Sequence, residues 1–156
     1  MLDIESGPDV DSSIKQLFDI VPALIAALIG WLFARTLLGN REPLIARAIL
    51  VVDGPEPLKD PAVIRYARRL TAVWAIFQFA LAAIGIVLAL HAWGMMASWD
   101  LPSPARFGLI GLPLAVAILF VAEFALRGWL LPQAPRLAFV EFLRRLLRAW
   151  PDLIKD

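Results

Sequence analysis

The stretch Leu70–Trp93, LTAVWAIFQFALAAIGIVLALHAW, decides the fold of this chain. It contains no aspartate, glutamate, lysine or arginine, and Gln78 is the only strongly polar side chain near its centre. A helix of about 20 mostly apolar residues is long enough to cross the roughly 30 Å hydrocarbon core of a bilayer. Residues 70–93 are therefore predicted to form a membrane-spanning helix.

Two further apolar segments flank this one, over residues 17–38 and 107–131. The first contains Pro22, which is expected in the first helical turn, where a missing N–H costs little. The second contains Gly111 and Pro113, which predict a kink near one end. The sequence thus predicts three membrane spans, joined by a long connection over 39–69.

The composition agrees with a membrane protein and excludes several kinds of site. Hydrophobic residues make up 60% of the 156 residues, against about 45–50% in a typical soluble domain. The chain has no cysteine and a single histidine, His91, so thiolate chemistry and multi-histidine metal centres are excluded. No metal or other cofactor is expected. The acidic, polar residues 1–16 do not resemble a signal peptide, so the first apolar segment is expected to stay as an anchor.

Basic residues predict the orientation. Of the 15 lysines and arginines, only Lys15 and Arg106 fall on one side of the predicted spans. The positive-inside rule places the richer side in the cytoplasm, with the N-terminus outside and the C-terminus inside. The other thirteen are Arg35, Arg41, Arg47, Lys59, Arg65, Arg68, Arg69, Arg127, Arg136, Arg144, Arg145, Arg148 and Lys155.

The cytoplasmic parts are expected to be helical as well. Pro43 and the apolar residues that follow it predict a short surface helix, and Asp60-Pro61 has the pattern of a cap that starts a helix continuing into the 70–93 span. Residues 132–156 predict a basic amphipathic tail that lies on the membrane. The fold class is therefore all-α, with three spans, a cytoplasmic surface helix and a basic amphipathic C-terminal helix.

The first candidate site is a basic patch at the start of the second predicted span. Arg65, Arg68 and Arg69 share one helical face with Tyr66 beside them, and Arg41 and Arg47 precede them. Such a patch suits a lipid phosphate or the acidic surface of a carrier protein. The plainer interpretation, and on composition the favoured one, is charge that only sets topology.

The second candidate is an intramembrane ion pair. Glu123 and Arg127 are four residues apart on one helical face, and Arg35 lies at a similar depth. A structural ion pair is the favoured interpretation, because both members of the pair lie near the interface. Glu123 is also a weak catalytic candidate, with Arg35 or Arg127 as a phosphate clamp, although no histidine, cysteine or second carboxylate is close to it in sequence.

Three stretches resemble a known family: Arg41-Glu42-Pro43-Leu44-Ile45-Ala46-Arg47, Arg65–Ala75 with the run RYARRLTAVWA, and Glu123-Phe124-Ala125-Leu126-Arg127. Together they resemble small bacterial inner-membrane proteins of the gene clusters that make aryl-polyene, xanthomonadin-like pigments. The resemblance covers residues 20–130. Many members are longer, with extra N-terminal spans, whereas this chain starts with an acidic tail. It implies a pathway and a membrane rather than a reaction. The positions that it makes worth testing are Arg41, Glu42, Pro43, Arg47, Arg65, Tyr66, Arg68, Arg69, Trp74, Glu123 and Arg127.

These observations favour a non-catalytic accessory protein that docks carrier-linked or lipid-linked intermediates, or pigment-pathway enzymes, at the cytoplasmic leaflet. An acidic acyl carrier protein suits its basic face. The alternatives are a small lipid enzyme that uses Glu123 and a structural subunit of a lipid exporter. A condensing enzyme is disfavoured because the chain lacks the required cysteine. No nucleic-acid partner is expected, since no matching fold signature is present. The oligomeric state stays open.

Overall fold

The computed structural model describes residues 10–39, 41–96 and 100–130, and every regular element in these ranges is a helix. Three helical stretches are long and apolar enough to cross a membrane, namely Asp11–Arg35, Pro61–Ala92 and Pro104–Leu126. The predicted all-α fold with three candidate spans is confirmed. The amphipathic helix predicted in residues 132–156 lies outside the described residues.

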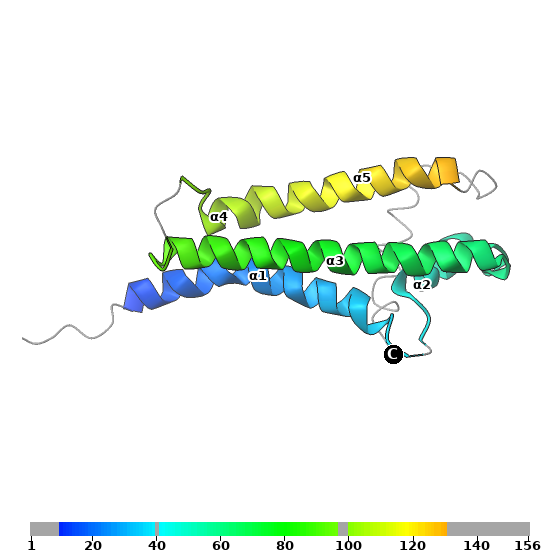
Figure 1. Ribbon diagram of the computed structural model, residues 1–156, viewed down its shortest axis with the longest axis horizontal. Coiled ribbons are helices and arrows are strands. Elements are labelled where there is room, and N and C mark those ends of the chain that lie inside the picture. Colours follow the sequence, from blue (N-terminus) through cyan, green and yellow to red (C-terminus); the bar gives the residue numbers. More distant parts are fainter. Residues whose placement is uncertain (1–9, 40, 97–99, 131–156) are drawn as a thin grey trace, which may run out of the picture.

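Helix α3, Pro61–Ala92, is the axis of the molecule (Figure 1). Its start is fixed by Asp60, whose side chain accepts a hydrogen bond from the Ala62 N–H at 2.8 Å, and by Pro61 in the first turn. The predicted cap and the unbroken helix are both confirmed. At about 1.5 Å per residue, its 32 residues reach about 48 Å. Because the hydrocarbon core is only about 30 Å thick, several turns of α3 extend beyond it.

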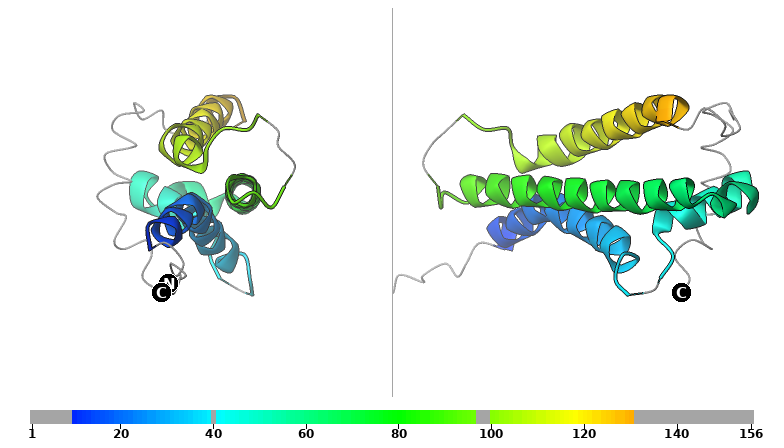
Figure 2. Two further views of the ribbon diagram at one scale, coloured as in Figure 1. Left: turned by 90° about the vertical axis from the view of Figure 1, so that its left-hand side faces the viewer. Right: turned by 45° about the vertical axis from the view of Figure 1, so that its right-hand side comes forward.

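Helix α1, Val10–Arg35, begins earlier and ends earlier than the predicted 17–38 segment. Asp11 in the first turn favours the earlier start, and Gly39, with φ of 69°, turns the chain after the helix. The expectation that Pro22 occupies the first turn is wrong, since it lies about three turns inside the helix. Figure 2 shows that α1 bends along its length, as an interior proline promotes.

The third span is irregular where it begins. A short helix α4, Pro104–Arg106, leads into a π-helical turn η2, Phe107–Gly111, and then into α5, Leu112–Leu130. In the π turn the Leu112 N–H donates to the Phe107 carbonyl, five residues back. The irregularity coincides with the kink predicted from Gly111 and Pro113.

Two short helices lie in the connection between α1 and α3. Helix α2, Leu44–Asp53, is followed by the 3₁₀ turn η1, Glu56–Lys59, with Gly54 at φ of 82° between them. The predicted short helix is confirmed. It packs beside the first turns of α3, where a small buried core forms from Ala46, Ile49, Val63 and Ala67.

The N-terminus of α2 is held by hydroxyl groups from elsewhere in the chain. Pro43 precedes the helix and offers no side-chain cap. Instead, the Leu44 N–H donates to Thr36 Oγ1 at 3.1 Å, and the Ile45 N–H donates to Thr71 Oγ1 at 3.3 Å. Both threonines are buried. Two of the N–H groups that a helix start leaves unpaired are therefore satisfied, and α2 is tied to α1 and α3.

The three long helices converge at one end of the molecule and diverge at the other (Figures 1 and 2). At the converging end, a Cβ on Gly85 of α3 would lie 2.9 Å from the Ala23 Cβ of α1, and a Cβ on Gly108 would lie 2.5 Å from the Pro22 Cγ. Only glycine allows such a close approach. The diverging end, where α1 ends, α3 begins and α5 ends, carries most of the lysines and arginines whose side chains the structure describes, and we call it the basic end.

Trp74 joins all three long helices between these two ends. Its ring stacks on Phe33 of α1 with centroids 5.7 Å apart, and meets Phe120 of α5 edge-on at 6.2 Å. The side chain is buried, at 6% exposure. Aromatic pairs of this kind are worth about 0.5–1.5 kcal/mol each beyond their buried area.

Replacing Thr71 by valine is expected to lower the free energy of unfolding by about 1–3 kcal/mol, because the half-buried Ile45 N–H loses its acceptor. Thermal unfolding of the purified protein in detergent measures this change. Thr71→Ser keeps the hydroxyl and serves as the control. A valine variant as stable as the wild type would contradict this role for Thr71.

Replacing Gly85 by leucine is expected to destabilise the protein by about 1–3 kcal/mol, since the new side chain meets the α1 backbone. Ala83→Leu adds a larger side chain at an exposed position of the same helix and should be close to neutral. Midpoints of thermal unfolding in detergent compare the two variants. Equal midpoints would show that the close approach at Gly85 is unimportant.

Candidate functional site

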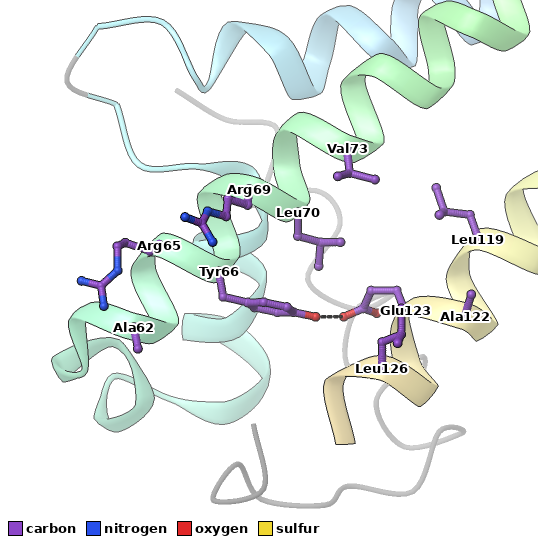
Figure 3. A pocket seen from close by; sticks show the side chains of 10 residues that line it. All are labelled: Ala62, Arg65, Tyr66, Arg69, Leu70, Val73, Leu119, Ala122, Glu123 and Leu126. Carbon is purple, nitrogen blue, oxygen red and sulfur yellow. Dashed lines mark hydrogen bonds between the residues drawn. The ribbon is translucent and has the colours of Figure 1, made fainter. Parts of the chain in front are cut away.

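A groove of about 540 Å³ lies between α3 and α5 at the basic end (Figure 3). Its volume falls within the range of about 300–1,000 Å³ that is usual for small-molecule sites. Helix α3 contributes Ala62, Arg65, Tyr66, Arg69, Leu70 and Val73. Helix α5 contributes Leu119, Ala122, Glu123 and Leu126.

The groove forms where α5 leaves α3. Beyond the Trp74–Phe120 ring contact, the two helices separate toward the basic end (Figure 1). Leucine and valine side chains line the part next to this contact, namely Leu70, Val73 and Leu119. Charged side chains belong to the part nearer the start of α3. One groove therefore joins an apolar part at membrane depth to a polar part at its edge.

A hydrogen bond crosses the groove. The Tyr66 hydroxyl donates to Glu123 Oε1 at 3.1 Å, and both side chains are half-buried. In Figure 3 the Tyr66 ring extends from α3 across to the Glu123 carboxylate on α5. The bond links residues 57 positions apart in the sequence. Sequence reasoning singled out both residues but did not pair them, although antiparallel spans put them at similar depth.

The three arginines of the predicted basic face are divided between two sides of α3. Arg65 and Arg69 are exposed, line the rim of the groove and point away from Glu123 (Figure 3). Arg68 instead donates to the Leu37 carbonyl at 3.1 Å, next to the connection between α1 and α2. The groove therefore brings together Arg65, Tyr66 and Arg69, while Arg68 braces the chain that leaves α1.

The other basic candidates lie away from the groove lining. Arg41 is exposed and precedes α2, and Arg47 is half-buried within α2. Helix α2 packs on the face of α3 that carries Val63 and Ala67, whereas neither of these residues lines the groove. These two arginines belong to the same basic end but to a different surface.

The predicted intramembrane ion pair is described only in part. The Glu123 carboxylate accepts the bond from Tyr66. Arg35 ends α1, is half-buried and is not among the residues that line the groove. The side chain of Arg127 lies outside the described part of the chain.

The groove offers hydrogen-bond donors and a carboxylate. Among the described residues, no group of three histidine, cysteine, aspartate or glutamate side chains is arranged to hold a metal ion. The guanidinium groups of Arg65 and Arg69 can each donate several hydrogen bonds to an anion. The Tyr66–Glu123 pair is a hydroxyl next to a carboxylate, so it is able to orient a polar group or exchange a proton with one.

Gln78 is a second polar feature, away from the groove. It is buried at 2% exposure, close to Gly30 on α1, and its Oε1 has no hydrogen-bond partner within the described residues. It packs against α1 at Gly30, and it is not among the residues that line the α3–α5 groove. The α3–α5 groove is therefore the stronger candidate site.

Comparison of the chain with protein-family models, with curated proteins and with solved structures found no match.

Proposed function

We propose that this protein is a membrane-resident accessory protein that holds an anionic, lipid-linked intermediate at the cytoplasmic leaflet of a bacterial inner membrane. The observation that carries the proposal is the groove, because its lining combines two arginine side chains at the rim with apolar walls between two candidate spans. An amphiphile has the matching pair of parts. Its charged headgroup contacts Arg65 and Arg69, and its chain lies against Leu70, Val73 and Leu119.

The orientation follows from charge. Thirteen of the 15 basic residues lie on the side of the predicted spans that holds the groove rim. By the positive-inside rule this side faces the cytoplasm. Intermediates made by cytoplasmic enzymes would therefore meet the rim directly.

The pathway assignment comes from the resemblance to proteins of aryl-polyene pigment clusters. Several residues of the stretches that carry this resemblance form the groove or the ring contact beside it, namely Arg65, Tyr66, Arg69, Trp74 and Glu123. We therefore propose that the amphiphile is an intermediate of pigment biosynthesis. An acidic carrier protein would contact the exposed arginines alone, whereas the apolar walls favour a lipid.

A lipid-modifying activity is the second candidate, and the Tyr66–Glu123 bond is the observation that favours it. A carboxylate that accepts a bond from a phenol inside a ligand groove is placed to act as a general acid or base. Replacing Glu123 by glutamine preserves shape and removes the charge. Loss of a lipid product with normal membrane insertion would support the enzyme, while unchanged product would exclude it. Co-purification of a larger transporter would instead indicate an exporter subunit.

Charge removal at the rim is expected to empty the groove. In the double variant Arg65→Gln/Arg69→Gln, the amount of anionic amphiphile that co-purifies with the protein should fall by about tenfold or more relative to the wild type. The reason is that charge-assisted hydrogen bonds dominate headgroup binding. Native mass spectrometry of the detergent-purified protein gives the occupancy. Lys59→Gln removes the same charge from an exposed residue of the basic end that pairs with Glu56. Equal occupancy in all three proteins would contradict the proposal.

Deletion of the gene is expected to change the pigment-lipid fraction of the cell. If the protein presents an intermediate to the next enzyme, that intermediate accumulates and the final pigment falls. Mass spectrometry of extracted lipids identifies the blocked step. An unchanged lipid profile would contradict the assignment to pigment biosynthesis, and the ligand of the groove would then be another amphiphile.

A further inference from the structure

We propose that the occupant of the groove is a lipid phosphate monoester, held by Arg65 and Arg69 and exchanged sideways with the inner leaflet. This inference rests on the proposed function and names the chemical class of the ligand. It follows from three features of the groove, which are the spacing of its arginines, the position of its carboxylate and its single-helix outer wall.

The two arginines favour phosphate over carboxylate. Arg65 and Arg69 are four residues apart, so their side chains leave the same face of α3 one turn apart. A phosphate monoester carries up to two negative charges and three terminal oxygens, so it can accept hydrogen bonds from both guanidinium groups at once. A carboxylate has two oxygens and one charge, and a single arginine satisfies it.

The position of Glu123 keeps the anion at the rim. Its carboxylate lies across the groove from α3, whereas Arg65 and Arg69 point the other way (Figure 3). An anionic headgroup pushed deep into the groove would approach a like charge, which is unfavourable. A headgroup at the rim is separated from that carboxylate by the Tyr66 ring. This arrangement of charges keeps the phosphate at the rim, and only the hydrocarbon chain of the lipid enters the groove.

The apolar part opens toward lipid rather than toward water. No residue in the most apolar window of the Pro104–Leu126 stretch is buried, so this span has bilayer on its outer side. Ile118 and Val121 of α5 are exposed at 60% and 58%. The hydrocarbon chain of a lipid that lies against Leu119 therefore has to pass only α5 to reach the acyl chains of the surrounding bilayer. The ligand exchanges with the leaflet without leaving the hydrocarbon.

Ligand titration of the full chain in phosphatidylcholine nanodiscs tests the inference. The probes are a 16-carbon lysophosphatidic acid, palmitate of the same chain length, a 16-carbon lysophosphatidylcholine and inorganic phosphate. We expect the lysophosphatidic acid to bind at least about tenfold more tightly than the palmitate or the lysophosphatidylcholine. Arg69→Gln should weaken lysophosphatidic acid binding by about tenfold and so remove most of this preference.

A pair of neighbouring variants tests where the chain lies. Leu119→Trp fills the groove and should abolish binding of both palmitate and the lysophosphatidic acid. Ile118→Trp places the same bulk on the exposed face of α5 and should leave binding unchanged. Helix content by circular dichroism confirms that both variants are folded.

The outcomes separate this inference from the proposed function. Equal affinity for lysophosphatidic acid and palmitate, both lost in Leu119→Trp, would overturn the phosphate assignment and leave an amphiphile groove. Equal affinity for lysophosphatidylcholine would also overturn it, as would displacement of the lipid by millimolar inorganic phosphate. Absence of binding by every lipid, in the wild type and in both tryptophan variants, would overturn the proposed function as well.

Discussion

Close backbone contact at one end of the bundle is the constraint on which the rest of the molecule depends. Gly85 and Gly108 let α1 approach both α3 and the start of the third span more closely than side chains allow. Helices that touch at one end and cross at an angle separate toward the other, and the bend of α1 adds to this separation. That separation leaves two spaces beside α3. Helix α2 fills the first, and the second remains as the groove between α3 and α5.

Polar groups have different roles in the two spaces. Around α2, polar groups turn inward, since Thr36 and Thr71 satisfy N–H groups that would otherwise be buried without partners. In the groove, one hydroxyl and one carboxylate meet between walls that are apolar except for two arginines at the rim. The first arrangement fixes an element in place, because every group involved is used within the fold. The second leaves donors and surface exposed to a ligand.

Most of the fold could be predicted from local sequence signals. The absence of charge in Leu70–Trp93, the Asp60-Pro61 cap and the helix start at Pro43 each act within a few residues, and each predicted the element that is present. Pro22 was misplaced because the helix around it starts in a polar segment that hydropathy does not mark. The site was harder to predict, since the Tyr66–Glu123 bond and the separation of Arg68 from its neighbours depend on how helices cross. One sequence contains no direct signal for that geometry.

The unbroken course of α3 couples the rim mechanically to the packing at Gly85. If α3 tilts as a rigid body about its contact at Gly85, residues far from that contact move the most. Arg69 lies sixteen residues from Gly85, or about 24 Å at 1.5 Å per residue. A tilt of about 10° at the pivot would displace the guanidinium by roughly 4 Å, which is comparable to the diameter of a phosphate. Small changes in bilayer thickness, which alter the tilt of a spanning helix, would thereby change the distance between Arg69 and the α5 wall of the groove.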